Sequence, residues 1–367
     1  MACELPPGEF SPGGDEVSRS GHARAAAADA DTDRRLHHAI GDLFLPEAAR
    51  LDERTRATIH HLLAGIVAGA EAEMRRHAAR LLTARGAIRA AETLLGGPPV
   101  LARLTDAGLL RDPELMEELI ARVELDLLFD ALPPSVATPD RASLLVRWAD
   151  APDGVVADAS LALMAADNRR RGASAGTGPI RNELPAELHQ RLLWWVAAAL
   201  RDQATESDGM AERDRALADA TLRSLGAHDE GDRSEAVAAR LANAVDAQAG
   251  ELGPLLVEAV ADRRAALFVA LLARAGGIDQ EQVRHLTVDP RGDLLILLLH
   301  AVGVERDRIA RIGVALAGAD SRRDLDRLAD AIDWAVAHDP RQARAALAPL
   351  ALNRDFRAAV RLLARGR

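Results

Sequence analysis

Histidine is the residue type in this sequence whose spacing comes closest to a reactive site. Among the eleven histidines, a first group lies in the N-terminal quarter of the chain: His37, His38, His60, His61 and His77. Neutral imidazoles are good metal ligands, but a helical zinc site usually needs two ligands one turn apart and a third nearby, as in HExxH. No HExxH motif occurs, and on one helix His61 and His77 point in different directions. The sequence therefore predicts no metal site and no cofactor.

His61 allows a second kind of chemistry. The string HLLAG, residues 61–65, places Gly65 one turn after His61, and it looks like part of the histidine-phosphotransfer motif. In that motif an exposed imidazole is the nucleophile, a small residue admits the partner's aspartyl phosphate, and a lysine supports the phosphoryl oxygens. Here Ala64 stands where the motif has the lysine. Phosphotransfer through His61 and Gly65 is therefore an alternative hypothesis and not the leading one.

Other catalytic motifs are missing. The chain contains no lysine, so a Walker A loop cannot form, and no GxSxG nucleophile motif is present. The single cysteine, Cys3, stands in a stretch rich in glycine and proline, which excludes a disulfide framework. Paired carboxylates such as Glu117 and Glu118 have the pattern of ordinary polar helix faces. We predict no catalytic residue.

The charge balance bears on possible partners. Lysine plus arginine number 46 against 56 acidic residues, a formal net charge of −10, which argues against a general nucleic-acid or anionic-membrane binder. Arginines cluster at 75–80 and 169–171, and a HEAT-like protein can bind nucleic acid through such clusters. A HEAT-like nucleic-acid binder is therefore a third hypothesis. The first run lies among acidic residues, and the second ends a predicted helix, where cations complement the helix dipole. Nucleic acid is not the expected partner.

These side chains must be positioned by helices. Apolar residues recur at steps of three and four over 52–84, and shorter helical patterns follow to residue 365. Strand signals are nearly absent, and aromatic residues make up only 2% of the chain. The turn Pro152–Gly154 separates two helices and resembles the turn of a HEAT repeat. The sequence predicts an all-α fold, either an irregular HEAT-like helical repeat array (an α-solenoid) or a multi-helix bundle.

The expected organisation has four parts. Residues 1–30 form a disordered tail, 31–172 an N-terminal helical module, 173–183 a linker rich in glycine, and 184–367 a C-terminal helical module. No signal peptide and no uncharged apolar run of 18 residues occurs, so we expect a cytoplasmic protein that does not span a membrane.

Three stretches resemble a known family. ELPAELHQRLLWWVAAALR at 183–201, the segment 267–304 with its Asp–Pro–Arg–Gly turn, and the long helix at 51–82 are similar to domain of unknown function 2336, a mostly alphaproteobacterial family. The resemblance rests on packing residues and turns, and it implies a helical fold with no established activity and no catalytic residues to carry over.

Trp194 is the residue that most clearly indicates a surface for binding a partner. On the helix around 184–202 it lies off the main apolar stripe, beside Glu187 and Arg191. A large aromatic outside the core either contacts another element or anchors a partner, and tryptophan is enriched at binding hot spots. Our leading hypothesis is a non-catalytic helical interaction or regulatory module that binds a protein partner through Trp194, Arg191 and Glu187. A homo-oligomer stays open.

Overall fold

The computed structural model describes residues 50–133, 142–174, 182–203, 209–248 and 250–365. The chain divides into two compact units, Met1–Asp52 and Glu53–Arg367. Every helix named below belongs to the second unit. The predicted tail at 1–30, Cys3, His37 and His38 lie outside the described residues, as does most of the predicted linker. The module boundary at 173–183 therefore stays a prediction.

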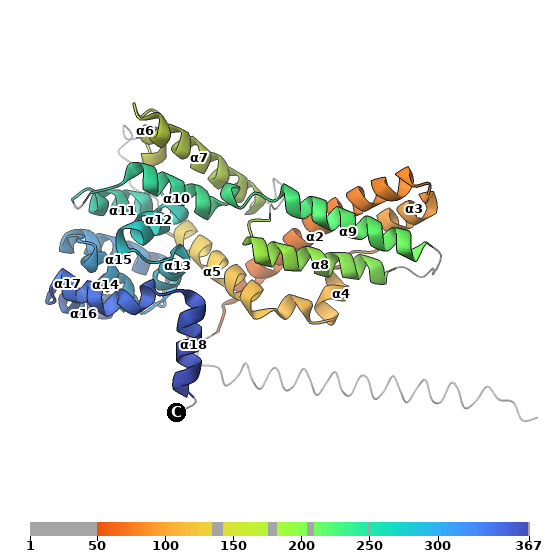
Figure 1. The fold of residues 1–367 in the computed structure, drawn as a ribbon. Helices are drawn as coiled ribbons and strands as arrows, with labels where there is room; N and C mark the ends of the chain where they lie inside the picture. Colours follow the sequence, from red (N-terminus) through yellow and green to blue (C-terminus); the bar gives the residue numbers. More distant parts are fainter. Residues whose placement is uncertain (1–49, 134–141, 175–181, 204–208, 249, 366–367) are drawn as a thin grey trace, which may run out of the picture. The chain divides into compact units, whose positions relative to one another are not determined.

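Over the described ranges the chain is all-α, as predicted, and contains no strand (Figure 1). The helices are α2 Glu53–Ala84, α3 Ile88–Gly96, α4 Leu101–Asp106, α5 Pro113–Asp130, α6 Leu144–Ala149, α7 Gly154–Ser174, α8 Ala186–Asp202, α9 Met210–Ala227 and α10 Ser234–Val245. They continue with α11 Leu252–Ala261, α12 Ala265–Gly276, α13 Gln280–Val288, α14 Asp293–Ala301, α15 Arg306–Ala319, α16 Leu325–Val336, α17 Pro340–Leu347 and α18 Arg354–Arg365. Short 3₁₀ turns occupy Leu109–Arg111, Glu230–Asp232 and Ala348–Ala351. None of the helices described is long and apolar enough to cross a membrane.

Helix α2 is the long helix that the sequence predicted at 52–84. Its apolar stripe is buried, with Ile66, Val67 and Met74 almost fully covered, and it packs against α3, α5, α8 and α9. The helix ends where Gly86 adopts a left-handed φ of 81° and the amide of Ala87 bonds back to the carbonyl of Leu82 at 3.0 Å. Contacts of α2 with α8 and α9 cross the predicted module boundary.

The turn at Pro152–Gly154 separates two paired helices, as the sequence indicated. Helix α6 ends at Ala149 and α7 begins at Gly154, with the Asp153 carboxylate accepting the Val155 amide at 2.9 Å. A short acceptor at this position satisfies a free amide of the first turn. Helix α7 then packs along both α6 and α10.

Helix α14 forms the centre of the C-terminal core. Five consecutive residues, Leu295 to Leu299, are buried because α12, α13, α15, α16 and α17 all pack around this helix. Close packing on several sides explains why this segment is an apolar run and not an amphipathic stripe. The same cluster continues through Phe268 of α12 to Phe129 of α5, whose ring centroids lie 5.8 Å apart.

Candidate functional site

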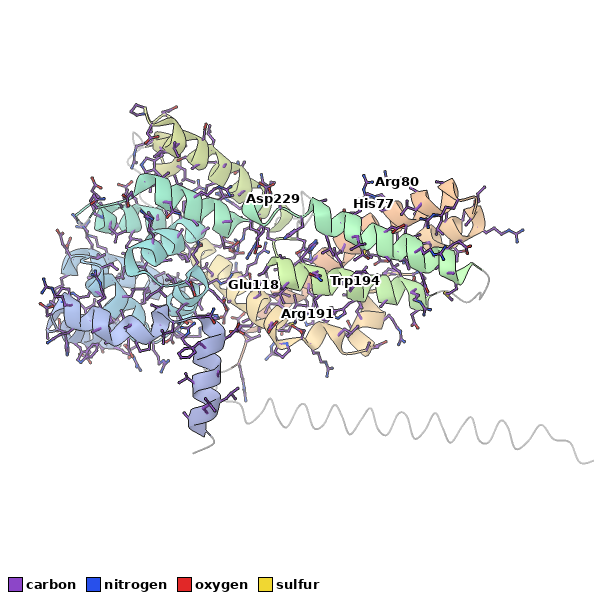
Figure 2. All side chains as sticks on the ribbon, viewed as in Figure 1. His77, Arg80, Glu118, Arg191, Trp194 and Asp229 are labelled. Atoms are coloured by element: carbon purple, nitrogen blue, oxygen red, sulfur yellow. The ribbon has the colours of Figure 1, made fainter. Side chains whose placement is uncertain are left out.

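The predicted partner surface on α8 is only partly free. Trp194, which Figure 2 labels on α8, is 40% exposed, as its off-stripe position indicated. Glu187 is also exposed. Arg191, in contrast, donates to Asp112 at 2.6 Å and to Glu114 at 2.7 Å. Asp112 caps α5 by accepting the Leu115 amide, so Arg191 joins α8 to the start of α5. Trp194 has an accessible face, whereas the neighbouring Arg191 guanidinium is already engaged in ion pairs within the fold.

His61 is exposed on α2, and Gly65 one turn later is half-buried. His61 also lines a cavity of about 400 Å³ to which α5 and α7 contribute Arg122 and Arg169. Trp194 is not among the residues around this cavity. His61 therefore lines the same cavity as arginines that are distant in sequence, whereas Trp194 does not line it.

Helix α5 carries a row of charged residues that the sequence analysis missed. Glu118, Arg122 and Asp126 follow at steps of four and share one face, which we call the α5 polar stripe. Glu118 is 9% exposed and Arg122 is 5% exposed. Arg284 of α13 donates to both carboxylate oxygens of Glu118, with the Nη1–Oε1 distance at 3.1 Å. Arg170 of α7 donates to Asp126 at 2.7 and 3.0 Å.

The interpretation of Glu117 and Glu118 as an ordinary polar helix face is wrong for Glu118. Glu118 is buried against Arg284, although its neighbour Glu117 is exposed (Figure 2 labels Glu118). The Arg170 side chain is 13% exposed and pairs with Asp126 and Glu235, so it is not a free cation at a helix end. Burial opposes the charge of Arg170, but the carboxylates of Asp126 and Glu235 outweigh that effect and raise its pKa. Charged pairs are tolerated in an interior when both partners are present.

The two arginine runs offer less basic surface than their sequence suggests. Arg75 is buried; it donates to Glu71 at 2.8 Å and to the carbonyl of Pro98 at 2.7 Å. In the other run Arg170 is held within ion pairs, which leaves Arg169 and Arg171 exposed. Nucleic-acid binding depends on guanidinium groups that can reach phosphates. Nothing in these contacts strengthens that hypothesis.

A row of exposed apolar residues lies on α18. Phe356, Val360 and Leu363 follow at steps of four and three, and they are 57%, 49% and 74% exposed. Arg357 anchors the start of the helix by donating to the Gln282 side chain at 2.6 Å. No other helix among those described packs extensively against α18, the dark blue helix in Figure 1. An amphipathic helix whose apolar face has no partner is unusual in a folded chain.

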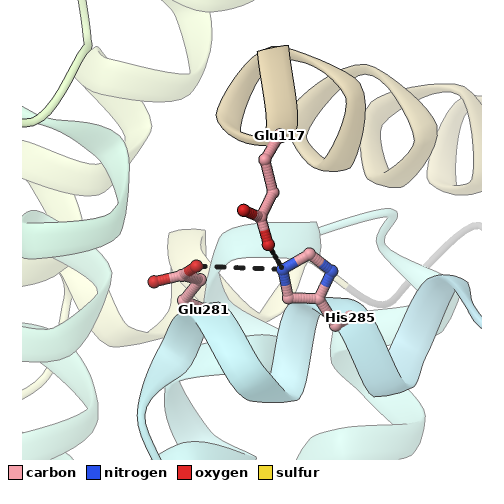
Figure 3. Close-up of side chains that lie close together, drawn as sticks. All are labelled: Glu117, Glu281 and His285. Carbon is pink, nitrogen blue, oxygen red and sulfur yellow. Dashed lines mark ion pairs between the residues drawn. The ribbon is translucent and has the colours of Figure 1, made fainter. Parts of the chain in front are cut away.

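One group of described residues is close enough to hold a metal ion. His285 and Glu281 of α13 and Glu117 of α5 each place one possible ligand atom within 4.8 Å of the others (Figure 3). The His285 Nε2 atom lies 3.7 Å from Glu117 and 3.8 Å from Glu281, so ion pairing alone accounts for the group. The side chains are 35–45% exposed, and no second observation points to a cation. We regard the group as a surface link between α5 and α13.

Comparison with known proteins identifies a family and no function. No curated protein and no solved structure matches the chain. A family model described as an uncharacterised protein conserved in bacteria, DUF2336, matches residues 143–348. The match contains the strings at 183–201 and 267–304 from which the sequence predicted this relationship, whereas the long helix at 51–82 lies outside it. The chain therefore belongs to the DUF2336 family of uncharacterised bacterial proteins.

Proposed function

We propose that this chain is a non-catalytic interaction module that binds a protein partner through α18. The observation that carries the proposal is the exposed row of Phe356, Val360 and Leu363. Amphipathic helices bind into apolar grooves through anchors at such spacings. Truncating a buried aromatic anchor of this kind commonly removes a large share of the binding energy.

The charges of α18 suggest what the partner looks like. Its sequence has one acidic residue, Asp355, against four arginines, Arg354, Arg357, Arg361 and Arg365. A groove with an apolar floor and an acidic rim would complement both features. An anionic membrane is a poorer match because the whole chain carries a net charge of −10. We therefore commit to a protein groove as the occupant of this face.

Substituting the exposed anchors tests this proposal. We expect Phe356→Asp with Leu363→Asp to reduce recovery of a stoichiometric partner at least about tenfold, because two anchors lose their apolar contacts. The measurement is affinity purification of the full chain from its own bacterium with quantitative mass spectrometry, followed by titration of the purified partner. Leu222→Asp on α9 is the matched control, since Leu222 is 59% exposed, close to the value for Phe356.

Two results would contradict the proposal. One is a partner that the Phe356→Asp, Leu363→Asp chain and the Leu222→Asp chain bind equally well. The other is flotation of the full chain with phosphatidylglycerol vesicles that is lost in the Phe356→Asp, Leu363→Asp chain, since that would make a membrane the occupant of α18.

Phosphotransfer through His61 stays a second candidate, and one observation favours it. His61 is exposed, and Arg54 and Arg169 line the same cavity, so they could supply the cation that Ala64 does not. In this reaction an imidazole nitrogen would attack the phosphorus of a partner's aspartyl phosphate, and the aspartate carboxylate would leave.

Incubation with phosphorylated response regulators tests this second candidate. We expect an acid-labile phosphoryl label on the wild-type chain and on His60→Ala, and at least about a hundredfold less on His61→Ala, because the nucleophile is gone. His60 is the matched control because it is exposed on the same helix, next to His61. A label of equal strength on His61→Ala, or no label on the wild type, ends the idea.

A further inference from the structure

Arg122 is a buried cation that is incompletely paired. Its Nη2 atom lies 3.3 Å from the Glu183 carboxylate, but neither Nε nor Nη1 has a hydrogen-bond partner. For the buried arginines Arg284 and Arg213, only Nε is a buried nitrogen without a hydrogen-bond partner. Leaving donors of a buried guanidinium unpaired costs stability. The structure thus contains two unused hydrogen-bond donors on one interior cation.

The same residue lines a cavity. Arg122 lines the space of about 400 Å³ that also contacts His61 of α2 and Arg169 of α7. Such a volume lies in the range of small-molecule sites. Apolar side chains, including Leu62 and Leu127, form other parts of the wall. The cavity therefore combines a buried cation with apolar surface.

The charges around the cavity favour an anion. Four arginines line it against three carboxylates, although the chain as a whole is acidic. One of the carboxylates, Asp126, is already engaged by Arg170 through two hydrogen bonds. Burial and the charge of Asp126 raise the pKa of the Asp130 carboxyl, which weakens its competition with an incoming anion. Arg54 and Arg169 are exposed and can reach such a ligand.

We propose that the cavity between α2, α5 and α7 binds a small organic molecule with an oxyanion head group, which pairs with the exposed guanidinium groups of Arg54 and Arg169 beside the buried charge of Arg122. The head group is a phosphate or a carboxylate, since both accept several charge-assisted hydrogen bonds from guanidinium groups. The apolar wall receives a short hydrocarbon part of the same molecule. This site does not involve α18 and requires no phosphoryl transfer to His61.

Calorimetric titration of the full chain with phenyl phosphate, benzoate and benzyl alcohol tests the site. Phenyl phosphate and benzoate carry the two candidate head groups, and benzyl alcohol is a neutral molecule of similar size. We expect one equivalent of phenyl phosphate or benzoate to bind and benzyl alcohol not to bind. Arg169→Ala and Arg54→Ala should each weaken binding about tenfold, because each removes one charge-assisted contact.

Matched variants separate a site from general charge attraction. Arg89→Ala removes another exposed arginine, one on α3 that does not line the cavity, and should leave the affinity within about twofold. Arg122→Met should abolish binding; if that chain does not fold, the two exposed variants decide, since their side chains are at the surface. The proposal is overturned if neither phenyl phosphate nor benzoate binds, or if Arg89→Ala weakens binding as much as Arg169→Ala does.

Discussion

Replacing Glu118 by glutamine is expected to lower the free energy of unfolding by about 3–5 kcal/mol, the usual result of removing one partner from a buried ion pair. Arg284 directs both terminal nitrogens at the Glu118 carboxylate, and the two side chains are 7% and 9% exposed. Glutamine keeps the shape but removes the charge, so Arg284 keeps only the more distant Glu235 carboxylate, at 4.0 Å, as an ion-pair partner. Urea denaturation at neutral pH, followed by circular dichroism, measures the change.

The adjacent residue provides the control for this prediction. Glu117 pairs with His285 at the surface, where its side chain is 45% exposed, and Glu117→Gln should cost less than about 1 kcal/mol. The double variant Glu118→Leu, Arg284→Met removes both charges and should recover much of the stability that Glu118→Gln loses. Equal losses of unfolding free energy for Glu117→Gln and Glu118→Gln would show that the buried ion pair contributes no more to stability than the surface pair.

Stability is also expected to fall by about 3 kcal/mol as the pH is lowered from 6.5 to 4, because of one buried histidine. Burial, and next the charge of the neighbouring His228, lower the pKa of His189 from 6.5 to about 4. The two rings stack with centroids 4.1 Å apart, and the Asn182 amide lies 2.5 Å from Nδ1 of His189. Between these pH values the unfolded chain binds a proton that the folded chain excludes, so folding is favoured above this window and weakened within it.

Urea denaturation at pH 7 and at pH 4.5 checks this prediction. His189→Leu should flatten the dependence of the unfolding free energy on pH over this window, whereas His60→Leu, at an exposed position, should leave it in place. Burial alone would raise the pKa of the Glu235 carboxyl, but the charges of Arg170 and Arg233 hold it at about 2. Glu235 therefore loses its stabilising contribution to the fold mainly below pH 4.5. An unchanged pH dependence in His189→Leu would refute the assignment to His189.

Local sequence patterns predicted the helices better than they predicted the site. The stripe of α2 and the turn at Pro152–Gly154 were predictable because each depends on neighbours within one or two turns. The family relationship followed from similar local strings. The exposure of Trp194 also follows from its position on one helix. Each of these features depends on residues that are close in sequence.

The α5 polar stripe could not be predicted in the same way. Glu118, Arg122 and Asp126 have the spacing of an ordinary solvated face, but contacts with other helices bury Glu118 and Arg122 and leave Asp126 half-buried beside Arg170. The cavity beside His61 was missed for the same reason, since Arg169 reaches it from α7. One sequence reveals that charges share a helix face, but it does not reveal whether another helix covers that face.

The distance in sequence between Glu118 and Arg284 determines when their ion pair can first form during synthesis of the chain. The two residues are separated by 166 positions. At about 5–20 residues per second, the ribosome needs roughly 8–33 s to reach Arg284 after it has added Glu118. Throughout that interval the carboxylate has no Arg284 to pair with, so α5 cannot complete its native contacts with α13. The Glu118 carboxylate therefore lacks this partner until the segment that contains Arg284 has been synthesised.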